Sequence, residues 1–293
     1  MVETWALFAI TTVLLCGVSG IVSKLALNNA PSSVLVIASF IVIMPASLLL
    51  LAYYILFIGL EGVELGCVAL GIVAAIFANL GFFLYFDALE KGPVLLIGSI
   101  TSAYPAVIVV TAILLMGDQL TLIQAIGTMV VISGVVTLLY IHGTATGKAK
   151  IPRIALLLSV LTIFSWATWG ISLKTAFDGG LDVLLYLGLA TLVMPPLTIG
   201  YLKLRNRGTK LSLPKYSLPL ILAIISVEIE QLGFYTETLS VNTGQASLVF
   251  PVVASYPVVT VVLAYAFLKE RLSLRETLLV LAVVTGIVLV AVI

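Results

Sequence analysis

The sequence predicts an all-α integral membrane protein of ten transmembrane helices, arranged as two inverted five-helix repeats. Three observations support this fold class: a very apolar composition, ten apolar runs of membrane-spanning length, and a repeat that relates the two halves of the chain. Of the 293 residues, 62% are hydrophobic and only 9% are charged. A soluble domain carries about 25% charged residues, so most of this protein's surface must face lipid.

Each of the ten apolar runs is long enough to cross a bilayer. A hydrocarbon core of about 30 Å needs about 20 residues at a rise of about 1.5 Å per residue, and charged, glycine and proline residues separate the runs. The predicted spans are 3–27, 33–58, 65–89, 93–116, 121–141, 153–176, 181–203, 215–240, 244–267 and 273–293. The connections between them are short, so the sequence leaves no room for a soluble domain.

An internal repeat relates the two halves of the chain. Aligning them at offsets of 150 and then 152 residues matches glycine, proline, tyrosine and lysine in a fixed order, which chance rarely produces. The matched residues are Gly20 and Gly170, Lys24 and Lys174, Pro45 and Pro195, Gly81 and Gly233, Tyr104 and Tyr256, and Pro105 and Pro257. The sequence therefore predicts a first repeat over 1–141, a connecting loop over 142–152 and a second repeat over 153–293.

Because each repeat has five spans, the second repeat must begin on the opposite side of the membrane. Inverted repeats are typical of secondary transporters, whose substrate site lies near the bilayer midplane between the repeats. Of the 14 lysine and arginine residues, all except Lys174 lie in or beside the odd-numbered loops. The positive-inside rule predicts that these loops are cytoplasmic. We therefore expect a multi-pass protein of the plasma or inner membrane with both termini on the external side.

The eighth predicted span, 215–240, has the densest polar content and is the best candidate for a binding site. Its polar residues are Ser226, Glu228, Glu230, Gln231, Tyr235 and Glu237. A charged group at the centre of a span costs about 3 kcal/mol on insertion scales, so its presence there indicates a function. Glu228 and Glu230 project about 200° apart and cannot face the same cavity.

The repeat favours one face of this span for the cavity. That face carries Glu228, Gln231 and Tyr235, and it aligns with a face of the third span that carries Asn79, Phe83 and Asp87. We therefore expect Glu228 to contact a substrate amine or a coupling proton.

Glu230 is the other coupling candidate. It lies on the opposite face of the eighth span, with Ser226 and Glu237, where it can pair with a neighbouring helix. In the alternative interpretation, one or both glutamates are structural, either protonated or paired with Lys174 or Lys24.

Aromatic and basic residues of other spans complete the predicted site. Trp166 lies about a dozen residues into its span, too deep for an interfacial belt, so Trp166 and Trp169 are candidates for stacking or cation–π contact with substrate. Tyr104 and Tyr256 precede prolines that kink their helices and are candidates to close the cavity. Lys174 is expected to pair with a carboxylate of the substrate or the protein. The alternatives are simple packing for the aromatic residues and snorkelling to the interface for the lysine.

Several of these patterns together carry a family resemblance. They are Trp166-Ala-Thr-Trp169-Gly170-Ile-Ser-Leu-Lys174, its weaker counterpart Gly20-Ile-Val-Ser-Lys24, the Tyr-Pro pairs at 104–105 and 256–257, and Phe267-Leu268-Lys269-Glu270-Arg271-Leu272. Over essentially its whole length, the chain resembles the EamA-like branch of the drug/metabolite transporter superfamily. The resemblance implies a ten-helix permease for amino acids, related metabolites, nucleotide-linked sugars or drugs.

One departure from the wider superfamily limits this inference. Related four-helix multidrug transporters carry a coupling glutamate eight residues before the lysine of the first helix. Cys16 and Trp166 occupy those positions here, so a proton-coupled drug antiporter of that design is not expected.

We expect a secondary transporter that moves a small polar metabolite, an amino acid or a related compound, out of the cell by alternating access. The alternative is a lipid or lipid-linked carrier translocase of the same architecture. The expected partners are a small-molecule substrate, membrane lipid and a coupling proton, and a monomer should suffice because one chain holds both repeats. The net charge of +1, without a basic stripe, predicts no nucleic-acid binding. The spans lack zinc, serine and cysteine–histidine catalytic motifs, so no enzyme activity, metal or cofactor is expected.

Overall fold

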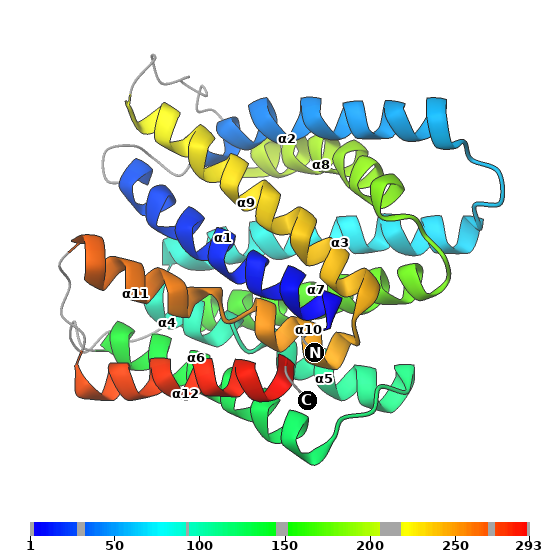
Figure 1. Ribbon diagram of the computed structural model, residues 1–293. Helices are drawn as coiled ribbons and strands as arrows, with labels where there is room; N and C mark the ends of the chain where they lie inside the picture. Colours follow the sequence, from blue (N-terminus) through cyan, green and yellow to red (C-terminus); the bar gives the residue numbers. More distant parts are fainter. Residues whose placement is uncertain are drawn as a thin grey trace.

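The computed structural model describes residues 3–27, 33–91, 94–144, 152–205, 218–268 and 273–291. Within these ranges the protein is helical and contains no β-strand (Figure 1). The first half contains α1 (Thr4–Leu27), α2 (Ser33–Tyr53), η1 (Tyr54–Ile58), α3 (Leu65–Lys91), α4 (Val94–Thr101), α5 (Tyr104–Thr111), η2 (Ala112–Met116) and α6 (Leu122–Thr144). The second half contains α7 (Arg153–Asp178), α8 (Val183–Arg205), α9 (Leu218–Thr243), α10 (Ala246–Val253), α11 (Tyr256–Leu268) and α12 (Leu274–Ala291).

These elements form ten membrane crossings, as the sequence predicts. Nine segments of the described chain are long and apolar enough to span a bilayer. The remaining crossing, the fourth, is divided among α4, α5 and η2, and its counterpart in the second half consists of α10 and α11. Trp5 at the start of α1 and Ala291 at the end of α12 belong to the same buried cluster, so both ends of the chain lie on the same side.

Proline residues divide the fourth and ninth crossings at matching positions. α4 ends at Thr101, before Tyr104-Pro105, and α10 ends at Val253, before Tyr256-Pro257. Proline disrupts a helix interior because it lacks an N–H and clashes with the preceding turn, but it is favoured in a first turn. The sequence predicts kinks at these prolines, and the structure shows complete breaks. By contrast, α2, α8 and α10 continue through their internal prolines.

The two halves interlock through their first and third helices. α1 packs along α9 and α3 packs along α7, and these two pairs make the most extensive helix contacts (Figure 1). A Cβ atom at Gly81 would lie 2.3 Å from the ring of Trp166, and one at the matching Gly233 would lie 2.6 Å from Sγ of Cys16. Glycine at such contacts lets membrane helices approach closely. The same close contact thus occurs twice, which is what an inverted duplication produces.

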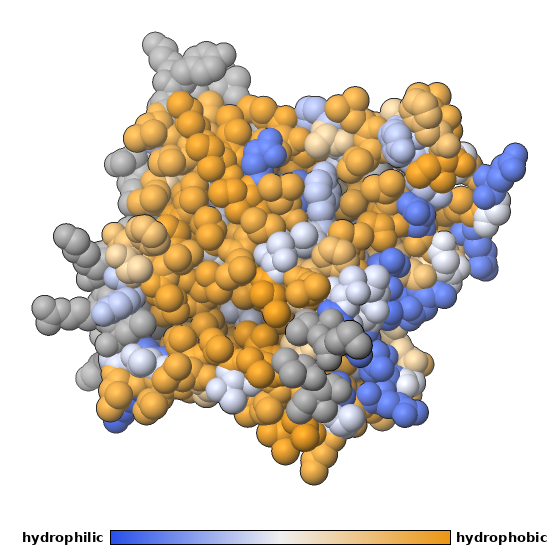
Figure 2. All heavy atoms as spheres, viewed as in Figure 1, coloured by the Kyte–Doolittle hydropathy of each residue, from blue (hydrophilic) through white to orange (hydrophobic). Residues whose placement is uncertain are grey.

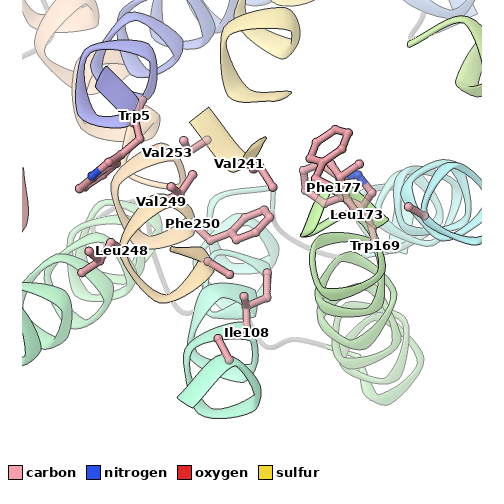
Figure 3. Packing of buried hydrophobic residues seen from close by; sticks show 14 of the residues in the cluster. Trp5, Ile108, Trp169, Leu173, Phe177, Val241, Leu248, Val249, Phe250 and Val253 are labelled. Carbon is pink, nitrogen blue, oxygen red and sulfur yellow. The ribbon is translucent and has the colours of Figure 1, made fainter. Parts of the chain in front are cut away.

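The largest buried cluster lies at one end of the bundle. It joins the start of α1 to α5, α10 and the ends of α7 and α9 (Figure 3). Its labelled members are Trp5, Ile108, Trp169, Leu173, Phe177, Val241, Leu248, Val249, Phe250 and Val253. Phe250 of α10 is fully buried, and it meets Ile108 of α5 beside Gly170 of α7. The helices are therefore packed tightly at this end.

Most described charged residues separate by sign between the two ends of the bundle, with Asp87, Lys174 and Glu276 as exceptions. The tightly packed end, called the acidic end, carries Glu3, Glu61, Glu64, Asp118, Asp178 and Asp182. The opposite end, called the basic end, carries Lys91, Arg153, Lys203 and Arg275. Between the ends the visible surface is mostly apolar (Figure 2), with exposed side chains such as Leu49, Leu114 and Met129. This distribution is that of a multi-pass membrane protein.

Candidate functional site

Seven side chains from six helices converge inside the bundle, and we call them the central cluster. The central cluster consists of Cys16, Tyr85, Tyr104, Trp166, Glu230, Glu237 and Tyr256, on α1, α3, α5, α7, α9 and α11. The ring of Trp166 contacts those of Tyr85 and Tyr104, with centroid separations of 5.5 and 5.6 Å. Both glutamates lie within electrostatic range of Cys16 and Tyr256. Three of these helices come from each half of the chain.

The central cluster lies where the two repeats meet. Six of its members form three pairs at the repeat offsets, Cys16 with Trp166, Tyr85 with Glu237, and Tyr104 with Tyr256. The seventh member, Glu230, lies near the middle of α9, and its counterpart is Ala78. The cluster is therefore close to the bilayer midplane, the usual position of the binding site between inverted repeats. Both of its acidic groups come from the second half.

Glu230 lies on the inward face of α9 but is exposed. That face carries Ser226, Glu230, Gly233 and Glu237. Ser226, Gly233 and Glu237 are buried, whereas Glu230 is not. The hydroxyl of Ser19 on α1 donates a hydrogen bond to Oε2 of Glu230 at 3.5 Å. An exposed side chain on an inward face requires an accessible space between the helices, and Glu230 borders that space.

Glu237 lies seven residues nearer the acidic end, about 10 Å along the helix axis. Its side chain is only 8% exposed. Within the described ranges it has no hydrogen bond and no ion pair. Burying a carboxyl group without a partner is unfavourable by several kcal/mol. Its presence at this depth therefore indicates a function rather than a contribution to stability.

Aromatic rings form the wall of the central cluster toward the acidic end. Tyr104 meets Phe250 edge to face at a centroid separation of 6.4 Å, and Phe250 meets Trp169 in the same way at 5.6 Å. The indole N–H of Trp169 donates a hydrogen bond to the hydroxyl of Tyr186 at 3.2 Å. Edge-to-face pairs contribute about 0.5–1.5 kcal/mol each beyond their buried area. These contacts therefore hold the wall in one arrangement.

Contacts between the two halves close the acidic end. Oδ2 of Asp118 accepts hydrogen bonds from the backbone N–H and the hydroxyl of Ser247, at 2.9 and 2.7 Å. Asp118 follows η2 in the first half, and Ser247 lies in the first turn of α10 in the second. The hydroxyl of Ser240 on α9 donates a hydrogen bond to the carbonyl of Trp5 on α1 at 2.8 Å. Both contacts tie together helices of different halves at this end.

Members of the central cluster differ in exposure. Tyr104, whose helix α5 runs toward the acidic end, is 8% exposed. Its counterpart Tyr256, whose helix α11 runs toward the basic end, is 40% exposed. Glu237, nearer the acidic end, is buried, and Glu230, nearer the basic end, is exposed. Glu230 and Tyr256 are therefore the accessible members of these two pairs.

Both halves of the chain match one family. Residues 3–140 and residues 153–292 each match the EamA-like transporter family. The chain belongs to this family. One solved structure, described as "Crystal structure of protein", aligns with 100% of this chain and 99% of its own at a TM-score of 0.77. The sequence identity is 17%, so this likeness concerns the fold alone. No curated protein matches the sequence significantly.

Membership of the EamA-like family makes this chain a transporter of the drug/metabolite type. The family match covers both halves, so the resemblance drawn from the tryptophan, lysine and Tyr-Pro patterns is confirmed. The predicted fold class, ten transmembrane helices in two inverted repeats, is confirmed as well.

Four residues predicted from the sequence lie in the central cluster of this EamA-like transporter, namely Glu230, Trp166, Tyr104 and Tyr256. Trp169 lies next to the cluster, in the aromatic wall. The structure thus brings the predicted aromatic residues together from α5, α7 and α11. Their role in substrate binding stays a prediction.

The sequence reasoning missed three members of the central cluster. Cys16 was considered only as the residue in place of a coupling glutamate, Glu237 was assigned to a secondary face, and Tyr85 was not singled out. The offset of 152 residues pairs Tyr85 with Glu237. A tyrosine and a glutamate at matched inward positions were a signal that could have identified this pair.

Glu228 lies on the outward face of α9, contrary to the orientation predicted from the sequence. It is exposed in the same stripe as Ile221, Ile225 and Leu232, which are one or two turns away. This stripe lies opposite Glu230, as the angle of about 200° between the two glutamates requires. Glu230 is therefore the member of the pair that faces the interior.

The predicted face of α3 packs against α8 rather than the central cluster. Phe83 stacks on Tyr201 of α8 at a centroid separation of 4.4 Å. The hydroxyl of Tyr201 donates a hydrogen bond to Asp87 at 2.7 Å, and the amide of Asn79 donates to the carbonyl of Ala75 in its own helix at 2.8 Å. The sequence predicts that this face lines the central cavity, whereas the structure packs Phe83 and Asp87 against Tyr201 of α8.

The matching residues of α9 are also set apart from the central cluster. Gln231 is buried, and Tyr235 is half-buried at the edge of the outward stripe. The hydroxyl of Tyr235 has no hydrogen-bond partner within the described part of the chain. A binding role for Gln231 and Tyr235 stays a prediction.

Lys174 pairs with a carboxylate of its own helix. Its Nζ atom lies 2.7 Å from Oδ1 of Asp178, one turn further along α7 at the acidic end. The carboxylate partner of Lys174 in this arrangement thus belongs to the protein, and a role of Lys174 in substrate binding stays a prediction. The ion pair contradicts the alternative in which Lys174 neutralises Glu228 or Glu230. The side chain of Lys24, the other proposed partner, lies outside the described residues.

Proposed function

We propose that this protein is a secondary transporter that moves a small polar metabolite bearing an amino group, an amino acid or a related compound, out of the cell by alternating access. The observation that carries the proposal is the exposed carboxylate of Glu230 between the repeats, close to Tyr85 and Tyr256. A carboxylate at this depth offers an ion-pair partner to an ammonium group. Neighbouring aromatic rings favour the same cation through their electron-rich faces.

The inverted repeats supply the two states that alternating access needs. In the arrangement described here, the contacts of Asp118 with Ser247 and of Ser240 with Trp5 close the acidic end. We infer that the space beside Glu230 opens toward the basic end. If the two halves exchange their conformations, the basic end closes and the acidic end opens, while Glu230 stays between them. The substrate is thus released on the side opposite to the one from which it entered.

The difference in charge between the two ends predicts which end faces the cytoplasm. Lys91, Arg153, Lys203 and Arg275 mark the basic end as cytoplasmic by the positive-inside rule. The arrangement described here is then the inward-facing state, in which Glu230 receives substrate from the cytoplasm. In the outward-facing state a proton that binds Glu230 displaces the amine, so an inward proton gradient drives export. One chain contains both repeats, so a monomer carries out the whole cycle.

Transport by purified protein in proteoliposomes tests this proposal. Uptake of labelled amino acids and amines would be compared between the parent and the variants Glu230→Gln and Glu228→Gln. Both variants remove one carboxylate from α9, but only Glu230 faces the interior, so Glu228→Gln is the matched control. We expect Glu230→Gln to abolish transport and Glu228→Gln to retain it. The reverse pattern would contradict the proposed site, and lipid translocation without metabolite uptake would favour the lipid translocase.

A further inference from the structure

The charge of the central cluster is unbalanced. Within the described ranges, Glu230 has a single long hydrogen bond from Ser19, and Glu237 has neither a hydrogen bond nor an ion pair. Lys174 is already paired with Asp178. The other basic side chains of the described part lie at the basic end, at Lys91, Arg153, Lys203 and Arg275. Two carboxylates without a basic partner in the described part of the chain favour a ligand that brings the positive charge.

The broken helices beside the cluster do not supply the missing positive charge. The start of a helix carries a partial positive charge and its end a partial negative charge of similar size. Only two residues separate the end of α4 at Thr101 from the start of α5 at Tyr104, and only two separate the end of α10 at Val253 from the start of α11 at Tyr256. The two partial charges at each break therefore largely cancel. A carboxylate on a ligand would meet Glu230 and Glu237 with little to attract it.

The two carboxylates are spaced for two separate positive charges. Glu230 and Glu237 share one face of α9 and are about 10 Å apart along its axis. An extended five-carbon diamine spans roughly 7–8 Å between its nitrogens. Lying beside α9 and parallel to it, such a diamine reaches both carboxylates through oblique ammonium–carboxylate contacts of about 2.8 Å. The rings of Tyr104, Trp166 and Tyr256 belong to the same cluster and can contact the apolar chain between the two charges.

From this arrangement we propose that the central cluster selects organic cations without a carboxylate, and that it binds an aliphatic diamine with one ammonium group at Glu230 and the other at Glu237. The inference rests on the proposed transport function and narrows its substrate class from amino acids to amines. Glu230, which is accessible from the basic end, binds the first ammonium group. The second ammonium group pairs with Glu237, which is buried deeper and has no partner within the described ranges.

Matched ligands test the proposal directly on the purified, full-length protein. Lysine is diaminopentane with one added carboxylate, lysine methyl ester removes the charge of that carboxylate, and pentylamine removes one ammonium group. Binding would be followed by tryptophan fluorescence and thermal stabilisation. Because Glu230 and Glu237 repel the carboxylate of lysine, we expect lysine to bind about 100-fold more weakly than diaminopentane, a difference of about 2.7 kcal/mol. The methyl ester should recover most of this loss, and equal affinities for lysine and diaminopentane would overturn the proposal.

Two variants distinguish the roles of the carboxylates. Glu237→Gln should lower the affinity for diaminopentane to that of pentylamine and leave pentylamine binding unchanged. Glu230→Gln should weaken both ligands, and Glu228→Gln should weaken neither. If Glu237→Gln does not fold, a series of diamines of increasing chain length on the parent protein replaces it. The proposal expects an optimum near five or six carbons, and a flat series would overturn it.

The failure of this inference is separable from the failure of the proposed function. Proteoliposomes that transport lysine as well as diaminopentane would overturn the cation selectivity but leave an amine transporter in place. Folded protein that transports neither amines nor amino acids would overturn both. Competition between diaminopentane and pentylamine for the same uptake would support both.

Discussion

Replacement of Asp118 by alanine should loosen the acidic end without unfolding the protein. Oδ2 of Asp118 accepts two hydrogen bonds from Ser247, so one side chain of the first half holds the start of α10 in the second. Loss of a capping carboxylate costs about 0.5–2 kcal/mol, and the hydrogen bond from the serine hydroxyl contributes about 1 kcal/mol. If Asp118→Ala destabilises only the closed arrangement, by about 2 kcal/mol, the ratio of molecules with an open acidic end to molecules with a closed one rises about 30-fold.

The native Cys16 can report this opening. It belongs to the central cluster, where it is half-buried beside Gly233. Cys67 is the only other cysteine of the sequence and would be replaced by serine. In oriented vesicles, a membrane-impermeant maleimide applied at the acidic end reaches Cys16 only when that end is open. The labelling rate in the Asp118→Ala variant should therefore rise about 30-fold when opening is faster than labelling.

Asp182 offers a matched control at the same end. Its Oδ1 atom accepts hydrogen bonds from the backbone N–H groups of Leu184 and Leu185, at 2.7 and 3.3 Å, so it caps α8 within one half of the chain. Asp182→Ala should lower the melting temperature to a similar extent but leave Cys16 labelling unchanged. An unchanged rate in Asp118→Ala, or equal increases in both variants, would refute the view that the contact between Asp118 and Ser247 holds the acidic end closed.

Three further predictions concern packing and the assignment of residues. Gly81→Ala should destabilise the protein by about 1–3 kcal/mol, because its Cβ would lie 2.3 Å from the neighbouring indole ring. Gly98→Ala, with no atom within 4 Å of its Cβ, should be neutral or stabilising, and denaturation in detergent compares the two. A double-mutant cycle of Trp169→Phe and Tyr186→Phe should give a coupling of about 1 kcal/mol for their hydrogen bond, and a value near zero would contradict that bond. Glu228→Leu should raise the melting temperature, because it removes a carboxylate from the outward stripe, where insertion costs about 3 kcal/mol, and should preserve transport. A loss of transport would return Glu228 to the site.

The membrane spans were predictable because contact with lipid constrains every residue of the outer surface. The predicted span 153–176 corresponds to α7 at 153–178, and 3–27 corresponds to α1 at 4–27. The breaks at proline were less predictable. A proline removes one hydrogen bond and restrains the residue before it, yet α10 continues through Pro251 whereas α4 ends before Pro105. Tertiary packing decides whether a helix continues through a proline or ends before it, and this packing cannot be read from the local sequence.

The orientation of α9 shows a different limit of sequence reasoning. The repeat correctly matched one face of α9 with one face of α3, and helical geometry correctly excluded that Glu228 and Glu230 share a direction. The match between the two faces did not show which helix or cavity each face contacts. Phe83 of α3 packs on Tyr201 of α8, so the matched face does not belong to the central cluster. Internal symmetry therefore relates positions to one another without showing which of them face the interior.

The central cluster also shows how duplication and divergence contribute separately to the candidate site. Tyr104 and Tyr256 are identical at matched positions, whereas Tyr85 corresponds to Glu237 and Ala78 to Glu230. The duplication thus fixes where the side chains meet, and divergence places both carboxylates in the second half.

This asymmetry assigns the carboxylates and the rings to different helix pairs. α9 carries both glutamates, and hydrogen bonds of Ser19 with Ser226 and of Thr12 with Thr236 bind it to α1. α3 and α7 form the other close pair and carry Tyr85 and Trp166. We infer that α1 and α9, the helix pair with the carboxylates, move as one unit and that α3 and α7, the helix pair with Tyr85 and Trp166, move as another. If a change of access alters the separation of the two pairs at the ends of the bundle and not at the central cluster, a cation bound between them contacts both pairs in either state.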